Sequence, residues 1–270
     1  MCLIVFGFNV HPKYKFIFAG NRDEFYERPT KPTSVWGNGV EILSGIDLKS
    51  GGTWLGVTIK DNVNKKVGDF SVVTNFRDFN LFPYDQNKES RGQIVKKFLM
   101  GDYPKHNIDL RYLDFAKWLE FNKDKFNPFS LIFGSFEKLY YYTNTTNTLI
   151  NIEHGIHGLG NQFLNSPEPK LVRAKKLFEH IVNNSNNITN DLLELLMDDV
   201  KFSQNVLPKT GLPDELEYLL SSIFIKSEKY GTRSSTVILV DRDNNLVFYE
   251  RNFENNGNKF FDKRFELMLY

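Results

Sequence analysis

The residue of this chain best suited to chemistry is its single cysteine, Cys2, which directly follows the initiator methionine. Removal of Met1 would leave a thiol and a free α-amine on the same residue. An α-amine titrates at about 7.7–8.0, so it can accept the thiol proton near neutral pH, as it does in N-terminal nucleophiles. Cys2 is therefore a candidate nucleophile that carries its own base. The alternative is a cysteine that packs as a small hydrophobe.

A second set of polar groups, Asn21-Arg22-Asp23-Glu24, follows the apolar run Phe16–Gly20. A polar turn at residues 9–15 separates this run from the strand-forming Leu3–Phe6, which predicts an antiparallel hairpin. The hairpin would bring the four polar residues close to Cys2. They can supply an oxyanion donor, a cation and a carboxylate. Four polar residues after a strand are also the way in which ordinary loops begin.

The composition excludes several classes of protein. A net charge of +1 with both signs interspersed lacks the basic stripe of a nucleic-acid-binding surface, so no nucleic-acid partner is expected. One cysteine excludes an internal disulfide and a cysteine-based zinc site. The five histidines are scattered, and His154 and His157 are interpreted as strand-end or loop residues. We therefore expect no metal site.

The sequence shows no membrane segment. No stretch approaches the roughly 20 apolar residues that span a bilayer, and the apolar run after Cys2 is too short for a secretory signal and has no charged leader. We expect a cytoplasmic protein without a membrane span. The composition leaves its oligomeric state open.

Strands at both ends and helices in two blocks between them predict an α+β fold of antiparallel sheets covered by helices, in a single domain of residues 1–270. Residues 29–36 are expected to form a loop because of Pro29 and Pro32. Predicted helices span Arg91–Met100, Asp109–Phe121, Pro169–Val182, Thr189–Met197 and Pro213–Ser221. Predicted strands, besides the hairpin, span Glu41–Ile46, Gly51–Ile59, Phe70–Asn75, Phe129–Phe136, Lys138–Thr143, Thr148–Glu153, Ser235–Asp241, Leu246–Asn252 and Lys259–Leu269.

Several motifs stand in order along essentially the whole chain: Cys2, Asn21-Arg22-Asp23-Glu24, Gly51-Gly52-Thr53-Trp54-Leu55-Gly56, Thr74-Asn75, Ser90-Arg91-Gly92, Gly158-Leu159-Gly160-Asn161 and Tyr230-Gly231-Thr232-Arg233 through Val240-Asp241. Taken together and in this order, they resemble the NRDE family. The resemblance implies the four-layer αββα sandwich of N-terminal nucleophile hydrolases. It also implies a role in Golgi organisation and protein secretion, in lipid and coenzyme A homeostasis, or in haem transport. The corresponding locations are the cytoplasm, the Golgi apparatus and the mitochondrion.

The chain is more distantly similar to cysteine-type acylases that hydrolyse conjugated bile acids and penicillin V. This similarity implies a catalytic set of an N-terminal cysteine, an Arg and an Asp after the second strand, two Asn and a late Arg. The matching residues here are Cys2, Arg22, Asp23, Asn75, Asn161 and Arg233. Arg22 and Asp23 are adjacent, whereas the acylases separate this pair by two residues, so either the local backbone differs or the roles have been reassigned.

Two functions follow from these resemblances. In the first, the protein is a trafficking or homeostasis protein that needs no cofactor and binds a small hydrophobic anion, haem or an acyl-coenzyme A, through Arg22, Arg233 and Asn75. In the second, it is a cysteine amidohydrolase or thioesterase whose nucleophile is Cys2. Fold alone does not decide between them.

Overall fold

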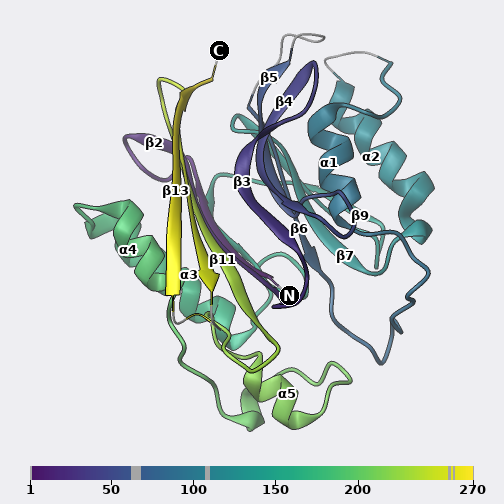
Figure 1. Ribbon diagram of the computed structural model, residues 1–270, viewed down its shortest axis with the longest axis vertical. Coiled ribbons are helices and arrows are strands. Elements are labelled where there is room, and N and C mark those ends of the chain that lie inside the picture. The colour runs from purple at the N-terminus through teal and green to yellow at the C-terminus, as the bar shows by residue number, and fades with distance from the viewer. Residues whose placement is uncertain (1, 62–67, 107–109, 255–256, 258, 270) are drawn as a thin grey trace. The chain divides into compact units, whose positions relative to one another are not determined.

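The computed structural model describes residues 2–61, 68–106, 110–254, 257 and 259–269 (Figure 1). It has an α+β fold with two antiparallel sheets and helices, as the sequence predicts. The chain forms two compact units. Unit 1 takes residues 1–28, 77–83 and 154–268, and unit 2 takes residues 29–76, 84–153 and 269–270. The single domain of residues 1–270 stays a prediction.

Unit 1 is built on a six-stranded antiparallel sheet in the order β10-β1-β2-β11-β12-β13. β1 is buried along its whole length, which explains why its sequence is continuously apolar rather than alternating. The edge strand β13 is largely exposed and rich in charge, as edge strands often are. The strands span Cys2–Phe8 (β1), Tyr14–Phe25 (β2), Gly155–Leu159 (β10), Tyr230–Asp241 (β11), Asn245–Glu254 (β12) and Lys259–Met268 (β13).

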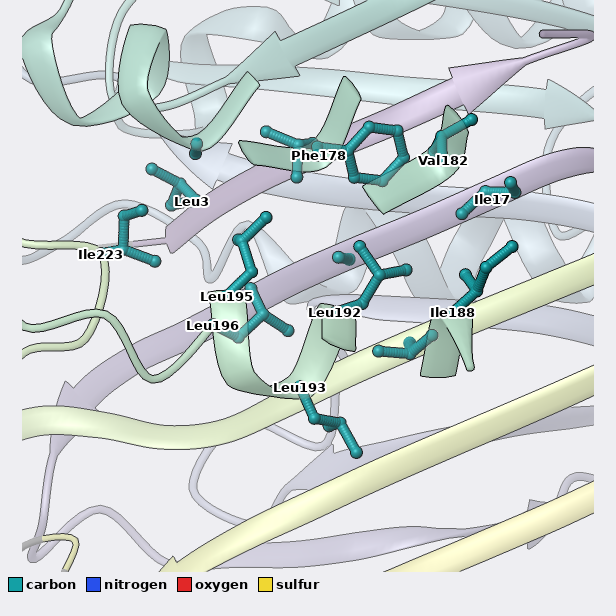
Figure 2. Packing of buried hydrophobic residues seen from close by; sticks show 14 of the residues in the cluster. Leu3, Ile17, Phe178, Val182, Ile188, Leu192, Leu193, Leu195, Leu196 and Ile223 are labelled. Carbon is teal, nitrogen blue, oxygen red and sulfur yellow. The ribbon is translucent and has the colours of Figure 1, made fainter. Parts of the chain in front are cut away.

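Helices pack on one face of this sheet. Pro169 opens α3 (Pro169–Asn184) at a position where its missing N–H costs nothing. α3 and α4 (Ile188–Leu195) bury apolar side chains against Leu3 and Ile17, and Figure 2 shows this cluster from close by. The short helices η3 (Gln204–Val206) and α5 (Asp214–Leu219) follow. Since side chains alternate along a strand, Cys2 and Ile4 point to the opposite face of the sheet from Leu3.

Unit 2 is a seven-stranded antiparallel sheet in the order β3-β4-β5-β6-β7-β8-β9. α1 (Gly92–Met100), α2 (Arg111–Asn122) and the short η2 (Lys123–Lys125) belong to this unit, and α1 and α2 share an apolar core with its strands. Asp109, where the second helix was predicted to begin, lies outside the described residues. The strands span Thr30–Trp36 (β3), Val40–Asp47 (β4), Leu55–Asp61 (β5), Asp69–Asn75 (β6), Phe129–Ser135 (β7), Lys138–Thr143 (β8) and Thr148–Asn151 (β9).

Three expectations about strands are wrong. Residues 30–36 form strand β3 rather than a loop; it is an edge strand, and its register shifts between Lys31 and Ser34, where Pro32 can be accommodated. Gly155–Leu159 form strand β10, so His157, which was interpreted as a strand-end or loop residue, lies in the middle of a strand. The second hairpin strand continues to Phe25 instead of ending at Gly20, so Asn21 to Glu24 lie within β2.

The strand predicted from Gly51 begins at Leu55, and Gly51–Thr53 precede it. The glycine at position 52 is required by a close approach of two backbone segments. A Cβ atom on Gly52 would lie 2.5 Å from the carbonyl carbon of Gly92. The glycine therefore lets the chain pass close to the start of α1.

Candidate functional site

Cys2 is the first residue of β1 and lies opposite Arg22 of β2, as the predicted hairpin requires. Its side chain is only 7% exposed. It is not in a purely apolar layer, because the backbone N–H of Asp23 donates to the thiol and the charges of Asp23 and Arg22 act on it. Cys2 thus lies within a polar site, although it is buried.

Burial raises the pKa of the Cys2 thiol, and the negative charge of Asp23 acts in the same direction. The N–H of Asp23 and the guanidinium of Arg22 oppose this rise. The thiol is therefore mostly protonated at neutral pH and needs a base to become a nucleophile. Met1, whose removal would free the α-amine of Cys2, lies outside the described residues.

Arg22 places a buried cation beside Cys2. The residue as a whole is 8% exposed, and its Nη2 lies 3.9 Å from a carboxylate oxygen of Glu24. Its Nη1 is buried and has no hydrogen-bond acceptor among the described residues. A buried N–H of a guanidinium is costly without an acceptor, so this atom is suited to an anion that binds there.

Asp23 is 3% exposed and lies opposite Thr232 of β11. The Thr232 hydroxyl donates to its carboxylate at 2.7 Å, and the Tyr230 hydroxyl donates to its main-chain oxygen at 3.0 Å. Burial raises the pKa of Asp23 to about 6, while the positive charge of the chain's α-amine, the ammonium of Lys170 and the Thr232 hydrogen bond oppose this rise. The carboxylate is therefore mostly ionised at pH 7, although it is buried.

Asn21 has a structural role rather than that of an oxyanion donor. Its amide donates to the carbonyls of Leu196 at 2.8 Å and Ile223 at 2.9 Å, and its own oxygen accepts from Ser235. Both donors of the side chain are thus used to hold two segments of unit 1 on the sheet.

Asn161 lies two residues after β10, the strand that pairs with β1. Leu159 lies opposite Ile4, so the same antiparallel register continued by two residues places Asn161 opposite Cys2. Asn161 is fully buried, and its main-chain oxygen accepts from the N–H of Arg77 at 2.7 Å. The motif Gly158-Leu159-Gly160-Asn161 therefore places the Asn161 amide close to the N-terminal end of β1.

Arg233 lies at a β-bulge, because the β2–β11 register shifts between Thr232 and Ser234. Its Nη1 donates to the carbonyls of Phe25, Tyr26 and Arg28 at 2.9, 3.1 and 3.0 Å. Burial lowers the pKa of Arg233, and the positive charge of Arg22 lowers it further. The two guanidiniums are therefore close enough to repel each other.

Asn75 is the last residue of β6 in unit 2, where it lies opposite Phe129. The expectation that it lies near Cys2 stays a prediction. Within unit 1, the structure brings Cys2, Arg22 and Asp23 together, places Arg233 close enough to Arg22 for their charges to interact, and puts Asn161 two residues beyond the strand that pairs with β1.

Several polar residues around this site were not singled out from the sequence. Arg77, Glu168, Lys170 and Glu217 are buried, and Tyr230 is partly buried. Tyr230 stands inside a motif that the resemblance includes, so its position gave a signal, whereas Arg77 lies two residues after the Thr74-Asn75 motif. Lys170 and Glu217 stand in predicted helices, where a charged residue is normally assigned to the solvated face.

The described residues contain no group of three or more His, Cys, Asp or Glu placed to hold a metal ion. Within the same residues, the helices are too short or too polar to cross a membrane. The site can offer a protonated thiol, an ionised carboxylate, a buried amide and two neighbouring guanidiniums. This set can bind an anion or, if a base removes the thiol proton, attack a carbonyl.

Comparisons with known proteins give matches that cover most of the chain. The family model described as Transport and Golgi organisation 2 matches residues 1–255. The human Transport and Golgi organization protein 2 homolog is 33% identical over 93% of this chain and 92% of its own length. Transport and Golgi organization protein 2 of Drosophila melanogaster is 30% identical over 93% and 91%. Among solved structures, Anbu from Hyphomicrobium sp. strain MC1 aligns with a TM-score of 0.41 at 8% identity, over 98% of this chain and 87% of its own.

Proposed function

Because the chain belongs to the Transport and Golgi organisation 2 (NRDE) family, we propose that it acts in transport and Golgi organisation by binding a small hydrophobic anion at Arg22. The protein works from the cytoplasm, in association with the Golgi apparatus. The names of the human and fly relatives support the cellular role. The positive charges of Arg22 and its neighbouring arginines support the binding of an anion there.

The observation that carries this proposal is the buried Nη1 of Arg22, which has no acceptor among the described residues. Arg233 and Arg28 add two more guanidiniums nearby, and Glu24 is the carboxylate that pairs with Arg22 and Arg28, at 3.9 and 3.7 Å. Both distances are long for an ion pair. A ligand carboxylate or phosphate would give Arg22 its acceptor and reduce the repulsion between the guanidiniums.

The ligand classes that the resemblance implies have the required chemistry. Haem carries propionate carboxylates, and acyl-coenzyme A carries phosphates, each joined to a large apolar part. Arg22 would hold the anionic end, since its planar guanidinium can donate two parallel hydrogen bonds to either group. Arg233 would contribute charge, because its Nη1 is occupied by three main-chain carbonyls.

Complementation tests whether the cellular role depends on this site. Cells of the host organism that lack the gene would receive the wild type, Arg22→Gln or Arg264→Gln, and secretion of a reporter would be measured. Arg264 is an exposed arginine of β13 paired with Glu266, so it is a matched control. We expect Arg264→Gln to restore secretion and Arg22→Gln to restore little of it, at equal protein levels. Full rescue by Arg22→Gln would contradict the proposal.

A second candidate function, thioester or amide hydrolysis, is favoured by the contact between the Asp23 N–H and the Cys2 thiol. The Cys2 sulfur would form a bond to the acyl carbon while its proton passes to the α-amine and then to the leaving thiolate or amine. Water would then release the acid and restore the thiol. Asn161 would donate to the oxyanion.

This second function requires that Met1 be removed, so it is tested first by the intact mass of protein isolated from its own host. Turnover of an acyl-coenzyme A then tests the thiol. Cys2→Ala should reduce turnover by several orders of magnitude if Cys2 is the nucleophile. A retained Met1, or equal turnover by Cys2→Ala, would rule out the self-activated nucleophile.

A further inference from the structure

Lys170 is a buried ammonium that neither candidate function uses. It is the second residue of α3, it is only 3% exposed, and its Nζ donates to the main-chain oxygen of Leu220 at 2.9 Å. One carbonyl does not compensate for taking a cation out of water. A buried lysine of this kind needs a counter-ion.

Hydrogen bonds tie Lys170 and Asp23 to the same segment, residues 220–225. Lys170 bonds the start of this segment at Leu220. At its end, the N–H of Ile225 donates to the Thr232 hydroxyl at 3.0 Å, and that hydroxyl donates to the Asp23 carboxylate.

Alternation along β2 agrees with this placement. Asn21 reaches the main-chain oxygen of Ile223 in the same segment, on the face of the sheet that α3 covers. Asp23, two residues further along β2, points to the same face as Asn21. The ammonium of Lys170 and the carboxylate of Asp23 therefore lie on the same side of the sheet, and hydrogen bonds connect both of them to residues 220–225.

The groups whose charges act on Lys170 belong to several segments of unit 1. Burial lowers the pKa of Lys170, and Arg77 lowers it further, whereas Glu168, Asp23 and Cys2 act in the opposite direction. Glu168 is the N-cap residue of α3, and its carboxylate accepts from Ser166 at 3.0 Å. The charge of Arg22 also acts on Asp23, and the Tyr230 hydroxyl donates to the main-chain oxygen of Asp23.

We propose that Lys170 is a positioning residue that acts through Asp23: its ammonium helps to keep this buried carboxylate ionised on the helix-covered face of the sheet, at the strand end that lies next to Cys2. The inference deepens the proposed function and rests on it, because an ionised Asp23 sets the charge of the site that receives the ligand. It does not depend on which ligand is bound.

The single cysteine allows a direct test. Protein that carries a ¹³C label at the Cβ of cysteine gives one NMR signal, from Cys2, whose thiol accepts from the Asp23 N–H. The shift of this signal would be followed from pH 4 to pH 9 in the wild type, Asp23→Asn, Lys170→Met and Lys170→Arg. Lys176→Met is the control, because Lys176 is an exposed lysine of the same helix.

We expect a step near pH 6 in the wild type, where Asp23 titrates, and its loss in Asp23→Asn. The step should move up by roughly one pH unit or more in Lys170→Met, since an opposite charge is removed. It should stay in place in Lys170→Arg and Lys176→Met. A step at the same pH in Lys170→Met, or no step in the wild type, would overturn the proposal.

Folding of the variants also decides the matter. If Lys170→Met does not fold but Lys170→Arg folds and keeps the wild-type step, the charge is what the site requires. If neither folds, Lys170 is a packing residue and the inference fails. Neither the NMR signal nor the folding of the variants depends on ligand binding or turnover. A negative result for Lys170 would therefore not contradict the proposed function.

Discussion

Arg77 and Glu217 form a buried ion pair, with Nη2 of Arg77 3.1 Å from Oε2 of Glu217. Both residues belong to unit 1, and both are almost completely buried. Glu217 also accepts from the N–H of Thr210 at 3.0 Å and from its hydroxyl, while the Arg77 N–H donates to Asn161. The pair therefore connects α5 to Asn161, which follows strand β10.

Removing one member of this pair should destabilise the protein strongly. Glu217→Ala leaves the Arg77 guanidinium buried without its carboxylate, so we expect a loss of about 3–5 kcal/mol in the free energy of unfolding. Glu215→Ala, an exposed carboxylate in the same helix, should change it by less than about 0.5 kcal/mol. Urea denaturation of both variants measures the difference, and equal stabilities would show that the pair is not important for the fold.

Asn21 should behave as a structural residue. Asn21→Leu removes two donors and leaves the carbonyls of Leu196 and Ile223 without this partner, which should cost about 2–6 kcal/mol, since each unsatisfied buried group costs about 1–3 kcal/mol. Ser235→Ala removes one hydrogen bond to the same amide and should cost about 1 kcal/mol. Thermal unfolding compares the two. A fully stable Asn21→Leu would return Asn21 to the list of candidate oxyanion donors.

The raised pKa of Asp23 predicts a pH dependence of stability. The folded value is about 6 and the ordinary value is 3.8, so the folded state holds the proton more tightly than the unfolded state does. This contribution is fully present below about pH 4 and is lost as the pH rises through about 6. The wild type should therefore lose about 3 kcal/mol relative to Asp23→Asn across this window.

Denaturation of the two proteins at several pH values checks this prediction. Asp23→Asn is the matched comparison because the amide oxygen can still accept from Thr232. A stability difference that does not change between pH 4 and pH 7 would mean that Asp23 titrates normally.

The hairpin was predictable because β1 and β2 are close in sequence and their apolar runs are separated by a polar turn. The end of β2 was not predictable in this way. Asn21 and Asp23 are polar, and polar residues after an apolar run usually indicate a loop. They remain in the strand because Asn21 and Asp23 find buried partners in Ser235 and Thr232 of β11, more than 200 positions away.

The same limit applies to the charged residues of the site. Lys170 and Glu217 look like solvated helix positions in the sequence, and only the fold reveals their burial. Local spacing cannot show that Lys170 bonds Leu220 or that Glu217 pairs with Arg77. The motifs around Cys2, Asp23 and Asn161 were found because the family resemblance joins positions that local patterns leave separate.

The central claim, that Arg22 binds the anionic end of a small hydrophobic ligand, is tested most directly by calorimetric titration with palmitoyl-coenzyme A and with haem. For at least one of them, Arg22→Gln should weaken binding by about 1.5–3 kcal/mol, roughly a ten- to hundredfold rise in Kd, because a charge-assisted hydrogen bond is lost. Arg264→Gln and Cys2→Ala should bind as the wild type does. Unchanged affinity of Arg22→Gln for both ligands, or no binding of either by the wild type, would contradict the claim.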